Sequence, residues 1–158
     1  MPIVAAVDQS PRAETVVEKA WELADVYDVD LHVVYVHRPS VDRLPGEVDP
    51  GHLSEGYSLG RVSRDSMVED LEEAAEAASE VPRELADTVD GLEEFEAVGL
   101  VGDPATQLLE YAAQQDAEYI VVSGRKRSPM GQAIFGSVTQ SLLLNADRPI
   151  VAVAHDPE

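Results

Sequence analysis

The chain contains no cysteine among its 158 residues, which excludes disulfide bonds and every mechanism that needs a thiolate. Long hydrophobic runs are also missing, and none approaches the roughly 20 residues of a membrane-spanning helix. The N-terminal segment has no basic stretch ahead of an apolar one, so it does not have the pattern of a secretory signal peptide. These absences predict a cytoplasmic protein with no membrane partner.

Basic residues are scarce, and their scarcity limits the classes of partner. Lysine and arginine number 11 against 31 acidic residues, so the formal net charge is −20. Such an excess of negative charge repels the phosphates of nucleic acids, which excludes a nucleic-acid partner. Only two of the basic residues are lysines, Lys19 and Lys126. An acid-rich, lysine-poor surface suits a protein that stays soluble in molar salt, which indicates a halophilic source.

Apolar runs of strand length alternate with segments of helical periodicity over the whole chain. The runs are rich in valine and isoleucine, which is typical of buried strands. Strand–helix–strand order predicts a five-stranded parallel sheet flanked by helices, doubly wound and Rossmann-like, in one domain of residues 1–158. The expected strands are 2–7, 31–36, 92–101, 119–122 and 150–154; the expected helices are 11–27 with Ser10 as cap, 61–87 interrupted near Pro82, 104 onward with Asp103 as cap, and 138–145.

The most informative stretch is 120–145, where a buried strand, a polar loop and a helix follow one another. Ser137 and Gln140 have the spacing of a capping box, which predicts Ser137 as the N-cap. The free N–H groups and the dipole of a helix N-terminus favour a bound anion. The loop also carries three consecutive basic residues, 125–127, so this stretch predicts a phosphate site.

Four polar or small residues follow the expected strands directly: Asp8, His37, Gly102 and Ser123. In parallel α/β sheets, ligands bind beyond the carboxyl ends of the strands, where the strand order reverses. We therefore expect a ligand cleft at this edge of the sheet.

The chain resembles the universal stress proteins. The resemblance rests on I-V-A-A-V-D-Q-S at 3–10, V-G-D-P-A at 101–105, and the closing loop and helix followed by R-P-I-V-A-V at 148–153. It covers nearly the whole chain, with 37–60 the least constrained part. It implies a UspA-like, adenine nucleotide alpha hydrolase-like fold, a homodimer formed through the last strand, unidentified protein partners and a role in stress survival.

The ATP-binding members of that family carry G-x2-G-x9-G-[S/T], and this chain keeps only Gly136 and Ser137 of it. Ser123 and Lys126 replace the two earlier glycines. The resemblance implies a site for ATP or another adenine nucleotide, with Mg²⁺ as a companion ion. By residue, it implies Asp8 and Val36 near ribose and adenine, Val122, Ser123, Arg125 and Lys126 along the loop, and Gly136, Ser137 and Val138 at the phosphates.

Other interpretations of the same residues remain open. Ser137 and Asp8 can serve only as a cap and a turn brace, and the three basic loop residues can pair with surface carboxylates. The loop is then structural, and the protein is a dimeric interaction module that binds no nucleotide. The segment 56–60 also matches the G-x-S-x-G pattern of serine hydrolases, with Ser58 as nucleophile, although no strand is expected before it.

The titratable residues show no pattern of an efficient enzyme. No activated nucleophile or general base stands out, so the sequence predicts no catalytic residue and at most slow ATP hydrolysis. The four histidines have no metal-ligand spacing, which predicts no metal site.

Overall fold

The computed structural model describes residues 1–38, 64–126, 133–134 and 136–155. Within these ranges, the side chains of 64–70, 125–126, 133–134 and 155 are not described. Ser58 and Arg127 therefore lie outside the described residues, as do residues 128–132 and 135 of the loop within 120–145. Among the described residues, every helix is too short or too polar to serve as a membrane span.

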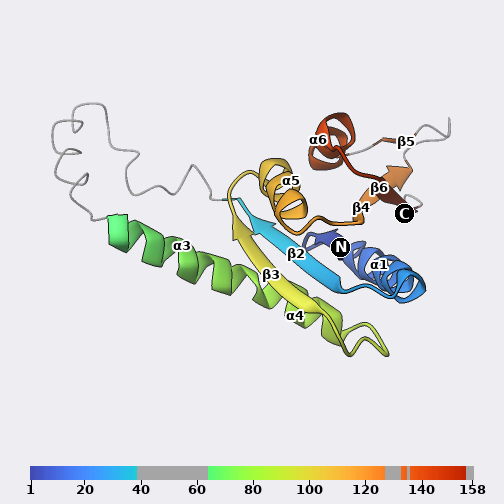
Figure 1. Ribbon diagram of the computed structural model, residues 1–158, viewed down its shortest axis with the longest axis horizontal. Coiled ribbons are helices and arrows are strands. Elements are labelled where there is room, and N and C mark those ends of the chain that lie inside the picture. Colours follow the sequence, from blue (N-terminus) through green and yellow to red (C-terminus); the bar gives the residue numbers. More distant parts are fainter. Residues whose placement is uncertain (39–63, 127–132, 135, 156–158) are drawn as a thin grey trace.

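Five parallel strands form the sheet, as predicted. The order across the sheet is β3-β2-β1-β4-β6, and the short β5 (Ala133–Ile134) pairs antiparallel with the end of β4. Figure 1 shows the sheet with helices on both sides. The strands are β1 (Ile3–Val7), β2 (Leu31–His37), β3 (Glu96–Val101), β4 (Tyr119–Lys126) and β6 (Ile150–His155).

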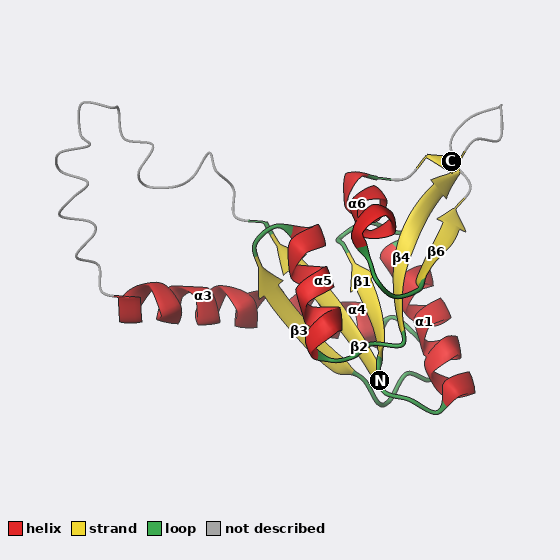
Figure 2. Cartoon of the chain, turned by 45° about the horizontal axis from the view of Figure 1, so that its top comes forward, coloured by secondary structure: helices red, strands yellow, loops and turns green. Residues whose placement is uncertain are grey.

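Two hydrophobic cores lie on opposite faces of the sheet, because successive strand residues point to opposite sides. On β1, Ile3 packs in one core and Val4 in the other, and both are fully buried. The first core lies against α1 (Ala13–Tyr27) and α4 (Glu80–Asp87). The second lies against α5 (Pro104–Gln114) and α6 (Ser137–Asn145), the pair in front of the sheet in Figure 2.

The predicted helix 61–87 is broken into α3 (Arg64–Ala78) and α4, with the interruption at Ser79. Pro82 lies in the first turn of α4, where its missing N–H costs least. The break near Pro82 was therefore predicted correctly.

Several expected boundaries were wrong. Those of the strands differ because pairing partners decide where strands begin and end. β4 continues past 122, since its ladder with β6 runs to the pair Arg125–His155. β3 begins only at Glu96, where pairing with β2 begins. Helix α1 begins at Ala13 rather than 11, and its N-cap is Arg12, so Ser10 is not the cap.

The start of α5 follows the predicted local signal. Asp103 is the N-cap, its carboxylate accepts a hydrogen bond from the Thr106 N–H at 3.1 Å, and Pro104 is the first helical residue. This hydrogen bond, the Thr106 hydroxyl and the nearby Arg38 guanidinium together hold the pKa of Asp103 below its usual value.

Candidate functional site

A cavity of about 330 Å³ opens at the carboxyl ends of β1 and β4. These two strands are neighbours, and the chain leaves β1 toward β2 and β3 but leaves β4 toward β6. The strand order therefore reverses between them, and this is where α/β sheets bind ligands. The volume lies within the range of small-molecule sites.

Seven of the nine predicted site residues line this one cavity: Asp8, Val36, Val122, Ser123, Gly136, Ser137 and Val138. They come from three strand ends and the start of α6, so the fold brings together residues that are far apart in the chain. Their role in binding remains a prediction. Arg125 and Lys126 belong to the end of β4, and their side chains lie outside what the structure describes.

His37 and Gly102, also expected at this edge, do not line the cavity. The Gly102 N–H instead donates to the His37 carbonyl oxygen at 2.9 Å, which joins the ends of β2 and β3. Gly102 has φ 139°, a conformation that favours glycine, so its role here is the turn.

Part of the cavity lining is apolar. Val36, Leu108 and Val122 contribute to it, and each is at most 8% exposed. They belong to one hydrophobic core, so their side chains are held by close packing. A flat, apolar group such as a purine base fits a surface of this kind.

Asp8 follows β1 and organises the turn into α1. Its Oδ1 accepts hydrogen bonds from the Ser10 N–H at 2.9 Å and from the Ser10 hydroxyl at 2.5 Å. Asp8 thus stabilises the turn before α1, as one of the two interpretations of this residue predicts. Among the described residues, no donor reaches Oδ2, which leaves that oxygen able to accept from a ligand hydroxyl.

The N-terminus of α6 contributes polar groups to the cavity lining. The N-cap is Gly136 with φ −64° and ψ 164°, so the prediction of Ser137 as cap was wrong. Ser137 is already the first helical residue, and no side chain among the described residues caps this end. The Thr139 hydroxyl donates instead to the Ser123 carbonyl oxygen at 3.0 Å, which ties α6 to β4. The first N–H groups of α6 therefore remain available to a ligand.

Sequence reasoning missed three polar members of the cavity lining: Arg12, Tyr35 and Thr139. Tyr35 lies inside an expected strand and Thr139 inside an expected helix. Nothing in the local sequence distinguishes a residue that lines a cavity from one that packs in the core. Arg12 follows directly after Ser10 and Pro11, and its closeness to the strand end was the one available signal.

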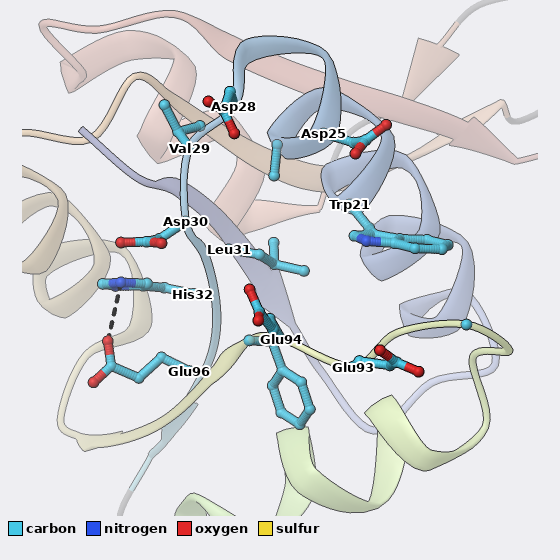
Figure 3. Close-up of a pocket in the computed structure, with 13 residues that line it drawn as sticks. Trp21, Asp25, Asp28, Val29, Asp30, Leu31, His32, Glu93, Glu94 and Glu96 are labelled. Atoms are coloured by element: carbon cyan, nitrogen blue, oxygen red, sulfur yellow. Dashed lines mark ion pairs between the residues drawn. The ribbon is translucent and has the colours of Figure 1, made fainter.

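A second cavity of about 690 Å³ lies at the amino ends of β2 and β3, on the opposite edge of the sheet. Figure 3 shows Trp21 and several carboxylates around it, including Asp25, Asp28, Glu93 and Glu94. Clustered carboxylates repel phosphate, so this cavity is unsuited to a nucleotide. Among the described residues, no group of three potential metal ligands is placed to hold a metal ion.

His32 closes one side of this second cavity and bridges two neighbours. Its Nδ1 lies 2.7 Å from the Tyr111 hydroxyl, and its Nε2 lies 3.0 Å from Glu96 Oε2, the contact dashed in Figure 3. Burial, and then the Glu96 charge, raise the pKa of Tyr111 to about 12. His32 is 6% exposed, and both ring nitrogens have partners, so it is a satisfied structural residue.

Comparisons with known proteins show the family and the fold of the chain. A model of the universal stress protein family matches residues 1–154. The structure of a universal stress protein from Archaeoglobus fulgidus is 33% identical, with 96% of this chain and 97% of that chain covered and a TM-score of 0.51. A universal stress protein of Mycolicibacterium smegmatis is 34% identical over 99 residues, which are 63% of this chain and 67% of that protein. A universal stress protein crystallised in complex with cAMP has the same fold, at 18% identity, with a TM-score of 0.57 and 98% and 96% of the two chains covered.

Proposed function

Since the chain belongs to the universal stress protein family, we propose that it is a stress-response regulator whose cleft beyond β1 and β4 binds an adenine nucleotide. The observation that carries this proposal is one cavity lined both by buried apolar side chains and by a helix N-terminus whose N-cap residue makes no side-chain capping hydrogen bond. The base would rest against Val36 and Val122, the ribose near Asp8, and the phosphate at Gly136 and Ser137.

The charge of the protein makes this site the natural place for a phosphate. The surface carries an excess of carboxylates, which repel anions. At the α6 N-terminus the partial charge is positive instead. The same fold is present in the protein crystallised with cAMP, a likeness that concerns the fold alone. It makes cAMP a useful probe beside ATP and AMP, with Mg²⁺ added as counter-ion of the phosphates.

The proposal predicts that ATP, AMP or cAMP raises the melting temperature of the protein in potassium chloride. At a ligand concentration of about 100 times Kd, the added stability should be about 2.7 kcal/mol. Ser137→Asp should weaken nucleotide affinity about tenfold or more, because a carboxylate faces the phosphate. The same change should leave the unliganded protein equally stable or slightly more stable, because an acid suits the first turn of a helix. Calorimetric titration and thermal melting check both parts.

Gln140→Glu is the matched control for that variant. It adds the same charge to an exposed position of the same helix, outside the cavity lining. We expect it to change nucleotide affinity much less than Ser137→Asp does. Equal losses from both variants, or no melting shift with any nucleotide, would contradict the proposed site.

The second candidate function is the dimeric interaction module, and it is favoured by the free edge of β6. Among the described residues, β6 pairs only with β4, and its residues Ile150–Ala154 are partly buried or exposed, unlike the mostly buried β1. An unpaired apolar edge favours association with a second copy. We therefore propose a homodimer formed through β6, with or without bound nucleotide, in a salt-rich cytoplasm.

Light scattering at low and at molar potassium chloride tests this assembly. Each chain carries a net charge of −20, so screening should favour the dimer as salt rises. We expect the mass of a dimer at molar salt and a larger monomer fraction at low salt. A monomer at molar salt would contradict the dimer, and a mass that does not depend on salt would contradict the salt-adapted setting.

A further inference from the structure

One atom of the Arg12 side chain, Nε, is buried without a hydrogen-bond partner. Arg12 is the N-cap of α1 and lines the same cavity as Asp8, Gly136 and Ser137. Its side chain is partly buried, and its Nε atom is fully buried with no hydrogen-bond partner. A buried N–H donor without an acceptor is costly and therefore needs an explanation.

The other basic side chains that the structure describes all pair with carboxylates. The pairs are Lys19–Glu22 at 2.8 Å, Arg38–Asp103 at 2.9 Å, Arg83–Glu80 at 3.0 Å and Arg148–Asp147 at 3.3 Å. Acidic residues outnumber basic ones by 31 to 11, so a carboxylate partner is easy to find in this chain. Within the described part of the chain, Arg12 alone among such side chains has no ion pair, although it shares a cavity with Asp8.

The backbone around Arg12 is held in place by the turn after β1. Its N–H donates to the Ser10 hydroxyl oxygen at 3.3 Å, and Ser10 is itself bound to Asp8. The side chain therefore extends from a fixed point at the cavity.

The surroundings of this guanidinium favour an anion. Three helices begin at the cavity, whose lining includes Arg12 as the N-cap of α1, Pro104 as the first residue of α5 and Gly136 as the N-cap of α6. The Asp103 side chain caps α5, whereas the N-cap residues of α1 and α6 make no side-chain capping hydrogen bond within the described part of the chain. Two helix N-termini and one guanidinium thus direct positive charge to one cavity. A guanidinium binds phosphate oxygens through a planar pair of N–H donors.

We propose that Arg12 binds a phosphate of the ligand together with the α6 N-terminus, and makes the cleft selective for phosphorylated over unphosphorylated nucleosides. This inference rests on the proposed nucleotide site and adds a residue that the glycine pattern does not include. Arg12 thereby offsets part of what Ser123 and Lys126 remove from that pattern.

Calorimetric titration with AMP and with adenosine tests this role, in the lowest potassium chloride concentration at which the protein remains folded. Wild type should bind AMP more tightly than adenosine. Arg12→Leu keeps an apolar stem and removes the guanidinium, and it should weaken AMP binding about tenfold or more. Its affinity for adenosine should change less than about twofold. Arg12→Lys keeps the charge without the planar donors, so its AMP affinity should lie between the two.

Arg83→Gln is the matched control, because it removes one arginine charge from a surface ion pair away from the cavity. It should leave AMP affinity within about twofold of wild type. AMP binding by Arg12→Leu that equals wild type would overturn the role of Arg12 while leaving the nucleotide site intact. Failure of wild type to bind either ligand would instead overturn the proposed function.

The melting temperature of the unliganded variants provides a second readout. Because the Arg12 Nε has no partner to lose, Arg12→Leu should melt at or above the wild-type temperature. A clear drop in both Arg12→Leu and Arg12→Lys would mean that Arg12 stabilises the fold, and would overturn the proposed role in binding.

Discussion

Gly99→Ala is expected to lower the free energy of unfolding by about 3 kcal/mol, the upper part of the range for overpacked cores. Gly99 lies in β3 against the junction of α3 and α4. A Cβ atom there would lie 2.0 Å from the Ala75 carbonyl oxygen, 2.4 Å from the Ser79 nitrogen and 2.8 Å from the Ala78 carbonyl carbon. All three are backbone atoms, so the helices must move away from the sheet. Urea unfolding in potassium chloride measures the loss.

Gly136→Ala is the matched control, because it adds the same methyl group where space is open. Among the described residues, no atom beyond the chain neighbours lies within 4 Å of the Cβ position at Gly136, and its φ of −64° suits alanine. Only the preference for glycine over alanine at an N-cap is lost, which should cost less than about 1 kcal/mol. Equal destabilisation by both variants would contradict the close approach of α3 and α4 to β3.

Leu142→Ala is expected to destabilise the protein by about 2–5 kcal/mol, as buried leucines do when truncated. Leu142 is fully buried and is the one residue of α6 with no exposed surface. It fixes α6 to the second core, and through α6 it places Gly136 and Ser137 at the cavity. We therefore expect weaker nucleotide binding as well, and titration after the urea series measures both effects.

Leu144→Ala is the matched control, because it makes the same substitution at an exposed position of the same helix. Leu144 is 76% exposed, so its truncation should change the free energy of unfolding by less than about 0.5 kcal/mol. If both leucine variants lose similar stability, α6 does not pack against the sheet through Leu142 as the structure shows.

Local signals in the sequence were sufficient where one short segment decides the structure. Asp103 and Pro104 predicted the start of α5 correctly, because capping needs only residues within one turn. The alternating apolar runs likewise predicted the five parallel strands, because a sheet covered on both faces needs apolar residues throughout. The family was identified from its motifs for the same reason, since these occur in order along the chain.

Local signals failed where distant segments decide. Ser137 and Gln140 have capping-box spacing, yet the N-cap of α6 is Gly136, and Thr139 binds Ser123 on β4, a contact that the spacing does not show. The end of β4 could not be predicted from its polar residues, since the ladder with β6 extends it. Arg12 was missed because its missing partner becomes visible only when every neighbour is in place. The sequence shows which side chains are charged, but it does not show which residues they contact.

The most direct measurement of the central claim is a map of backbone amide chemical-shift changes as AMP is added to the labelled protein. Binding in the cleft beyond β1 and β4 predicts changes gathered at Asp8, Arg12 and Val36 and at Gly136–Thr139, with Trp21 beside the second cavity unaffected. Changes gathered around Trp21 and Glu93, or no changes at any AMP concentration, would contradict it.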